Sequence, residues 1–147
     1  MSIFYVGQTD YINQLNLLYG PANILGTVSQ TAGVPTGAIF QDITNANGKA
    51  VMYADGTMIC YGSIVASSIP ITTANGGSYI SAVQSLTYAA NFISVPSVDM
   101  YVQLSTSGLV GLMQSSASNS SVGGYLFSAV SRTDTVTLSY QAIGRWF

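Results

Sequence analysis

The chain has 147 residues and a formal net charge of −2, and only 5% of its residues are charged, against about 25% in an ordinary soluble domain. Its basic residues, Lys49, Arg132 and Arg145, are too few to neutralise a row of phosphates, so we expect no nucleic-acid partner. No apolar run reaches the roughly 18 residues that a membrane-spanning helix needs, so we expect no membrane insertion. This length is sufficient for one domain with a buried core.

The N-terminal sequence MSIFYVGQTDY has neither the basic segment nor the long apolar segment of a secretory signal. The weakly charged composition, rich in hydroxyl and amide groups, nevertheless resembles that of an extracellular adhesin. A virus protein that is released when its host lyses would reconcile these two observations. We therefore expect the protein to be part of a virion.

The N-terminal part of the chain is predicted to be an arm with one short helix. Apolar side chains recur at helical spacing in residues 10–19, and Gly20 with Pro21 would end that helix. A helix this short is not stable alone, so it must dock on another surface. Residues 22–47 carry glycine and proline at short intervals and predict an extended segment.

The sequence YADGTMICYGSIV places an Asp-Gly pair between two apolar runs, a strong signal for a β-hairpin. A two-residue turn would pair Tyr53 with Met58. A three-residue loop with Gly56 in the left-handed region would pair Tyr53 with Thr57 instead. We favour this second register because it gathers bulky β-formers on one face. That face would carry Val51, Tyr53, Ile59 and Tyr61.

From Gly48 onward, short β-rich runs alternate with turn residues, which is typical of an antiparallel sandwich or barrel. After the two strands of the hairpin, strands are expected over residues 78–88, 97–105, 124–131 and 136–147. The sequence RTDT, residues 132–135, is predicted to form the last turn. The fold class is therefore all-β: a small antiparallel β-sandwich of about six strands, preceded by the N-terminal arm.

No catalytic arrangement is evident in the sequence. Catalysis needs groups that titrate or attack near neutral pH, and the chain has neither histidine nor glutamate. Asp55 and Asp134 occupy predicted turns, where aspartate is favoured for structural reasons. We expect no enzyme, no cofactor and no metal site, although a hard cation held by carboxylate and carbonyl oxygens is an alternative that stays open.

Three motifs together resemble the C-terminal receptor-binding domain of bacteriophage tail fibres. They are NANGKAVMYADGTMICYGSI (Asn45–Ile64), LTYAANFISVPSV (Leu86–Val98) and LSYQAIGRWF (Leu138–Phe147). This resemblance implies a trimeric, H-type-lectin-like β-sandwich knob at a fibre tip, which binds bacterial surface polysaccharide or a protein. Such fibres usually carry a long shaft before the knob. The chain would therefore be a short fibre or the tip on another protein's shaft.

We accordingly divide the chain into an N-terminal attachment and trimerisation arm, residues 1–45, and a receptor-binding β-sandwich domain, residues 46–147. The arm would attach to a phage tail or baseplate protein. An apolar arm and a surface with little charge both require buried partners, which favours an intertwined homotrimer. The leading hypothesis is a tail fibre adhesin that recognises a host-cell surface glycan. The alternative is a structural virion protein of the baseplate or a decoration, without receptor binding.

The receptor site is expected on an exposed surface that combines tyrosine with hydroxyl and amide groups, because these suit sugar rings and sugar hydroxyls. Residues 105–124 predict a long loop of this composition, and the strand before it directs its polar side chains outward. The candidate site residues are Tyr101, Gln103, Asn119, Tyr125 and Arg132, and Arg132 would contribute if the glycan is acidic. Alternatively, Tyr101 packs in a subunit interface and the loop fills the trimer axis.

Trp146 has two interpretations. It is either an exposed platform for a sugar or an anchor that fills the core or a subunit boundary. We favour the anchor, because a tryptophan that ends a strand is more often buried than exposed.

Overall fold

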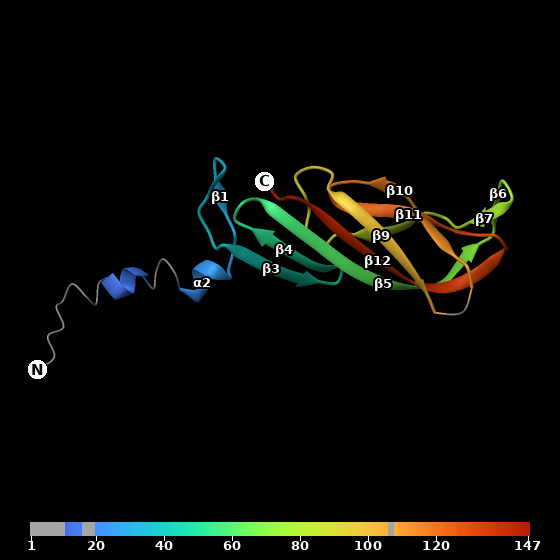
Figure 1. The fold of residues 1–147 in the computed structure, drawn as a ribbon, viewed down its shortest axis with the longest axis horizontal. Coiled ribbons are helices and arrows are strands. Elements are labelled where there is room, and N and C mark those ends of the chain that lie inside the picture. The colour runs from blue at the N-terminus through green and yellow to red at the C-terminus, as the bar shows by residue number, and fades with distance from the viewer. Residues whose placement is uncertain (1–10, 16–19, 106–107) are drawn as a thin grey trace, which may run out of the picture.

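The computed structural model describes residues 11–15, 20–105 and 108–147. Nearly all of its regular structure is β (Figure 1). In chain order the elements are α2 (Pro21–Ile24), β1 (Gln30–Thr31), β2 (Val34–Pro35), β3 (Phe40–Asn45), β4 (Gly48–Tyr53), β5 (Thr57–Ile71), β6 (Thr73–Asn75), β7 (Ser78–Ile80), β8 (Gln84–Thr87), β9 (Ser97–Leu104), β10 (Gly111–Ala117), β11 (Ser121–Ser128) and β12 (Arg132–Arg145). Within these ranges, no helix has the length and apolar character needed to cross a membrane.

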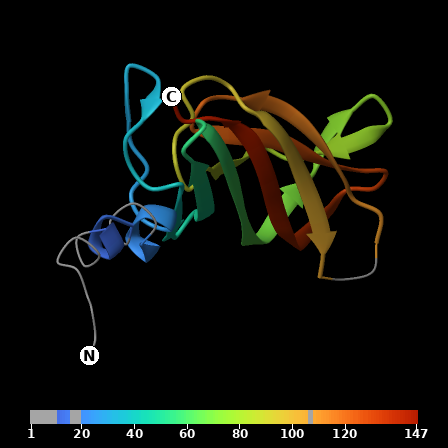
Figure 2. The ribbon, with the colours of Figure 1, turned by 60° about the vertical axis from the view of Figure 1, so that its left-hand side comes forward.

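Two antiparallel sheets form the layers of a β-sandwich (Figure 2). The first, which we call the main sheet, has five strands in the order β3-β4-β5-β12-β9. The second sheet has the order β10-β11-β7-β6, and β8 also pairs with β11. The predicted all-β sandwich is confirmed. Its two sheets have five strands each, more than the six expected in all, because β3, β6 and β10 were not foreseen and the strand predicted over residues 78–88 forms both β7 and β8.

The core lies between the two sheets and follows the alternation of the strands. In β12, the residues Val136, Leu138, Tyr140 and Ala142 are all buried, as the sequence predicts. The second sheet contributes Leu126, which is also buried. Each inward residue is followed by an outward one, so the same strands also present a second set of side chains to solvent.

The hairpin of β4 and β5 has the register of the three-residue loop. Met52 lies opposite Met58, and Gly56 has a φ of 91°, in the left-handed region. The Asp55 carboxylate accepts a hydrogen bond of 2.8 Å from the Thr57 amide, which stabilises the turn. The favoured register is therefore confirmed. Met58 faces the core and Tyr61 faces solvent.

The loop predicted over residues 105–124 is wrong. Strand β10 occupies much of this segment and pairs with β11, with a bulge between Gln114 and Ser116. Its central side chains are polar and exposed, and they show no apolar alternation. Backbone hydrogen bonds to β11, which the side-chain pattern does not reveal, hold this strand in place.

The turn predicted over residues 132–135 is also wrong. Arg132 lies opposite Ile71, and Asp134 opposite Ile69, so this segment begins strand β12. Asp134 is buried and forms an ion pair with Arg132. The sequence RTDT was interpreted as a turn because its charged residues suggest exposure to solvent. A buried ion pair does not produce the alternation of apolar side chains that identifies a strand.

The strand predicted over residues 78–88 is interrupted. It forms two strands, β7 and β8, separated by residues 81–83. The buried Ser81 hydroxyl marks this break: it accepts a hydrogen bond of 3.0 Å from the Leu126 amide and donates one of 2.6 Å to the Ala82 carbonyl. The Ser81 backbone amide also donates to the Leu126 carbonyl at 3.0 Å, so the pairing with β11 extends to Ser81 before the strand breaks.

The N-terminal part agrees with its prediction only in places. Residues 11–15 are helical, whereas Leu18 and Tyr19 of the predicted helix lie outside the described residues. In Figure 1 the helical segments lie at one end of the sandwich. Strand β3 pairs with β4 up to Asn45, so part of the predicted arm belongs to the main sheet. The division into two domains at residue 45 stays a prediction.

The hydroxyl of Tyr140 joins three segments inside the sandwich. It donates a hydrogen bond of 3.0 Å to the Asn47 carbonyl in the β3–β4 turn. It also accepts one of 3.1 Å from the Ala89 amide. The neighbouring ring of Tyr88 lies with its centroid 5.3 Å from that of Tyr140. The buried hydroxyl of Tyr88, in contrast, has no hydrogen-bond partner among the described residues.

This pair of phenols predicts a loss of stability at high pH. Burial, followed by the nearby Tyr140 and Cys60, raises the pKa of Tyr88 from 10.0 to about 12. The folded state therefore favours the neutral phenol, and its contribution to stability is complete below the unfolded pKa of about 10. We expect the free energy of unfolding to fall between about pH 10 and 12, in urea titrations at fixed pH, and to fall less in Tyr88→Phe. An equal decline in both proteins would contradict this origin.

Candidate functional site

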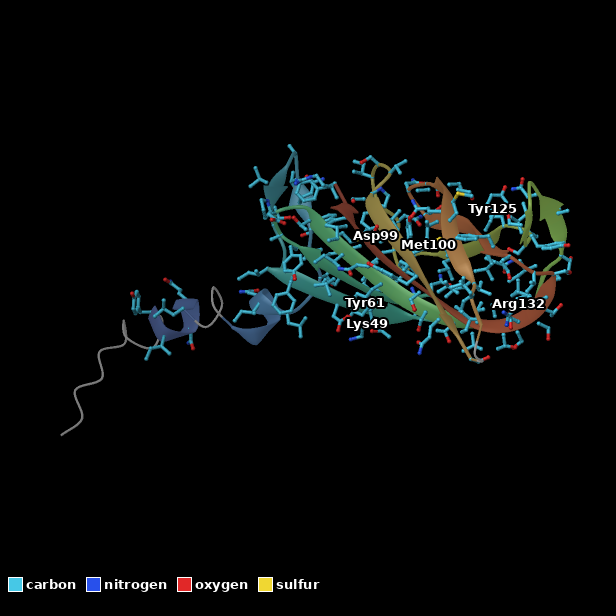
Figure 3. The ribbon with its side chains drawn as sticks, turned by 45° about the vertical axis from the view of Figure 1, so that its right-hand side comes forward. Lys49, Tyr61, Asp99, Met100, Tyr125 and Arg132 are labelled. Carbon is cyan, nitrogen blue, oxygen red and sulfur yellow. The ribbon has the colours of Figure 1, made fainter. Side chains whose placement is uncertain are left out.

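Antiparallel pairing arranges the outward side chains of the main sheet in rows across its strands. One row consists of Lys49, Tyr61, Gln141 and Asp99. The adjacent row consists of Ser63, Ser139 and Tyr101. Figure 3 labels Lys49 and Tyr61 on the green strands of this sheet and Asp99 near β9. The two rows form a surface that carries tyrosine rings, serine hydroxyls and one amide, with the charged groups of Lys49 and Asp99 at the two ends of one row.

An open hollow of about 520 Å³ lies on this face. Its lining includes Ile59, Tyr61 and Ser63 from β5, Ser139 and Gln141 from β12, and Tyr101 from β9. The side chains of Tyr61 and Tyr101 are 44% and 54% exposed, so both rings remain available to a ligand. Because β12 lies between β5 and β9, and Tyr61 and Tyr101 lie in adjacent rows, their backbones are separated by two strand spacings across the sheet and two residues along it, or ~12 Å.

The alternation of β9 explains why Tyr101 faces outward. Val98, Met100 and Val102 are half-buried toward the core, whereas Asp99, Tyr101 and Gln103 are exposed, as the sequence predicts. A shift of the strand by one residue would bury these polar side chains and expose the apolar ones, so the burial of one face fixes the orientation of the other.

Charged groups border the hollow without lining it. The Lys49 ammonium lies 3.2 Å from the Asp42 carboxylate, and both side chains are partly exposed. The hydrogen bond from Lys49 to Asp42, together with the charge of that carboxylate, raises the pKa of Lys49. Asp99 is exposed and has no ion-pair partner within the part of the chain that the structure describes. The hollow itself is lined by neutral side chains.

Two of the five predicted site residues lie on this face. Tyr101 lines the hollow, and Gln103 follows it on the outward side of β9, opposite Thr137. The structure thus brings Tyr101 and Gln103 together with Tyr61 and Gln141, which were not predicted.

Tyr125 lies on the opposite side of the sandwich. Its neighbour Leu126 is buried in the core. Its other neighbour, Gly124, also faces inward, because a Cβ placed there would lie 3.4 Å from the sulfur of Met100 on the facing sheet. Tyr125 is therefore directed outward from the second sheet, away from Tyr101.

Asn119 and Arg132 lie away from the hollow and have contacts of their own. The Asn119 carbonyl accepts a hydrogen bond of 2.8 Å from the Phe92 amide, in the turn between β10 and β11. The Arg132 guanidinium binds the Asp134 carboxylate, with one hydrogen bond of 2.8 Å. The five predicted residues consequently do not form a single cluster.

Four residues of this face were not predicted from the sequence as site residues: Tyr61, Ser63, Ser139 and Gln141. The alternation within each strand does indicate that these side chains face outward. Tyr61 lies on the outward face of the predicted hairpin, and Ser139 and Gln141 alternate with buried residues of β12. The sequence does not show that β12 lies between β5 and β9, and this order is what makes them neighbours.

Trp146 is an anchor, which confirms the favoured interpretation. Its indole packs against the core, and its Nε1 donates a hydrogen bond of 2.8 Å to the Tyr53 carbonyl. Its backbone amide donates to the Gly56 carbonyl at 3.0 Å. Trp146 therefore ties the C-terminus to the β4–β5 turn.

No cluster of three or more histidine, cysteine or carboxylate side chains that could hold a metal ion occurs in residues 11–15, 20–105 and 108–147. The outer face of the main sheet presents tyrosine rings, serine hydroxyls and the amide of Gln141 around the hollow.

Comparison with protein-family models gives no match, and no curated protein matches the chain. Among solved structures, it is similar to a C-terminal portion of the P. aeruginosa R1 pyocin fibre, with a TM-score of 0.52 and 18% identity. That alignment covers 68% of this chain and 26% of the fibre portion, so the chain spans about a quarter of that structure.

A second similar structure is an N-truncated R1-type pyocin tail fibre, with a TM-score of 0.52 and 15% identity. Here the alignment covers 97% of this chain and 98% of the other. At these identities the similarity shows a shared fold. This fold is one that tail fibres contain, in agreement with the resemblance to phage tail fibres in the sequence.

Proposed function

We propose that the protein is a tail fibre adhesin that attaches a virion to its host by binding a glycan of the bacterial surface. The observation that carries this proposal is the pair of exposed rings, Tyr61 and Tyr101, on either side of one hollow lined with hydroxyl and amide groups. The fold shared with pyocin tail fibres supports the same conclusion.

The chemistry of the hollow suits a saccharide. A sugar ring has an apolar face, which packs on the flat face of a tyrosine, and hydroxyl groups around its edge. The hydroxyls of Ser63 and Ser139 and the amide of Gln141 can both donate and accept hydrogen bonds. A diagonal spacing of ~12 Å between the tyrosine backbones leaves room for a sugar ring between their side chains.

Two further parts of the proposal concern assembly. The chain acts as a homotrimer with an H-type-lectin-like knob, and the N-terminal segment attaches it to a phage tail or baseplate protein. Support comes from the scarcity of charge, since only 5% of the residues are charged, and from exposed apolar side chains such as Ile12 and Leu25 in the N-terminal segment.

A second candidate function is a structural virion protein that uses the same face to contact another copy of the chain. The observation in its favour is that Val65 and Ile143, which are 69% and 46% exposed, lie on β5 and β12 beside the tyrosines. Burial of such a face in an interface would remove apolar surface from water.

The double variant Tyr61→Ala/Tyr101→Ala separates these functions. We expect the purified wild-type protein to compete with virions for host cells. The variant should compete at least tenfold less well, a loss of about 1.4 kcal/mol, because buried aromatic contacts dominate binding energy. A matched control is Met113→Ala/Phe127→Ala, which removes two exposed side chains from the second sheet.

Sedimentation of the same proteins completes the test. An unchanged oligomeric state together with lost competition supports the adhesin. A variant that competes like wild type contradicts the proposed site, and a variant that dissociates favours the structural function.

A further inference from the structure

We propose that the hollow selects uncharged glycans and disfavours acidic ones; this inference rests on the proposed function and specifies its ligand class. All eight residues that line the hollow, among them Tyr61, Tyr101 and Gln141, are of types other than Asp, Glu, Lys and Arg. A ligand is therefore held by ring contacts and by neutral hydrogen bonds.

The nearest unpaired charge is negative. Asp99 lies directly opposite Gln141, on the row that also contains Tyr61, and its side chain is exposed. No described residue forms an ion pair with it. A uronic acid or sialic acid beside Gln141 would meet this carboxylate and be repelled.

The positive charges cannot compensate for Asp99. Lys49 lies on the same row, but its ammonium is held by Asp42 at 3.2 Å. The charges of Lys49 and Asp42 cancel, so the pair attracts an acidic sugar only weakly.

Both arginines are engaged away from the hollow. Arg132 binds the carboxylate of Asp134, which is buried. Arg145 donates hydrogen bonds of 2.8 Å to the Asp55 carbonyl and 3.2 Å to the Phe147 carbonyl. The expectation that Arg132 would contact an acidic glycan is thus not supported by its place in the fold.

The charge distribution leads to a specific binding behaviour. Affinity that comes from stacking and neutral hydrogen bonds is insensitive to ionic strength, whereas affinity for a polyanion falls as salt increases. A neutral polysaccharide would therefore be bound equally well at low and high salt.

The test is an array of bacterial surface polysaccharides, half of them neutral and half containing uronic or sialic acid, probed at about 20 mM and about 500 mM NaCl. We expect binding to neutral polysaccharides at both salt concentrations and at least tenfold weaker binding to acidic ones. Asp99→Lys should raise the ratio of acidic to neutral binding several-fold. Asp42→Asn, which releases Lys49, should raise it in the same direction.

Each outcome on this array decides a different claim. Strong binding to acidic polysaccharides that falls with salt overturns the inference and leaves the adhesin in place. An unchanged binding ratio in both variants overturns the role given to charge at this face. Binding to no polysaccharide overturns the inference together with glycan recognition itself.

Discussion

Gly48→Ala should lower the free energy of unfolding by about 2–6 kcal/mol, because two separate costs add at this position. Gly48 has a φ of 127°, which a residue with a side chain rarely adopts. A Cβ here would also overlap the Tyr61 carbonyl oxygen and lie 2.7 Å from the Gly62 Cα. Both are backbone atoms of β5, so no change of rotamer can relieve the overlap.

The control for this prediction is Gly76→Ala, in the β6–β7 turn. Gly76 also has a positive φ, of 54°, but a Cβ there would meet nothing within 4 Å. We expect this variant to lose about 1–2 kcal/mol of the free energy of unfolding, measured in urea, because only the cost of a positive φ applies. Equal losses in the two variants would show that contact between the β3–β4 turn and β5 does not constrain the fold.

Tyr140→Phe is expected to have the second largest effect, a loss of about 1–3 kcal/mol in the free energy of unfolding. The substitution keeps the ring and removes only the hydroxyl that binds the Asn47 carbonyl and the Ala89 amide. It leaves both backbone groups without this partner, and a buried backbone group that loses its hydrogen bond is costly.

Tyr88→Phe is the matched comparison, since the two rings are neighbours and both are buried. The Tyr88 hydroxyl has no hydrogen-bond partner in the described part of the chain, so its removal should leave stability at neutral pH unchanged or slightly higher. If Tyr88→Phe lost as much stability as Tyr140→Phe, the assignment of the hydroxyl contacts would be contradicted.

The local parts of the fold were predictable because side-chain periodicity records them. The alternation in β9 and β12 correctly gave the buried face of each strand. The Asp-Gly pair gave the hairpin, and the grouping of bulky β-formers on one face gave its register, in which Gly56 has the positive φ.

Other parts of the fold depend on contacts that no local pattern records. The polar strand β10 is defined by backbone pairing with β11 rather than by burial of its own side chains. The Arg132–Asp134 ion pair is buried by strands distant in sequence. Charged and serine-rich segments were therefore interpreted as turns and loops.

The candidate site shows the same limit. Tyr101 was predicted from its own strand, because it is an outward tyrosine between polar residues. Its partner Tyr61 could not be assigned to the same site, because only the strand order β5-β12-β9 brings the two rings to one hollow. Tyr125 was grouped with Tyr101 by sequence proximity, although β11 belongs to the second sheet.

The most direct test of glycan recognition at this face is a crystal structure of the protein with oligosaccharides released from the surface polysaccharide of its host. The account predicts a sugar ring between Tyr61 and Tyr101, with its hydroxyls hydrogen-bonded to Ser139 and Gln141. A sugar bound on the β10–β11 face, or a second copy of the chain covering the two tyrosines, would contradict it.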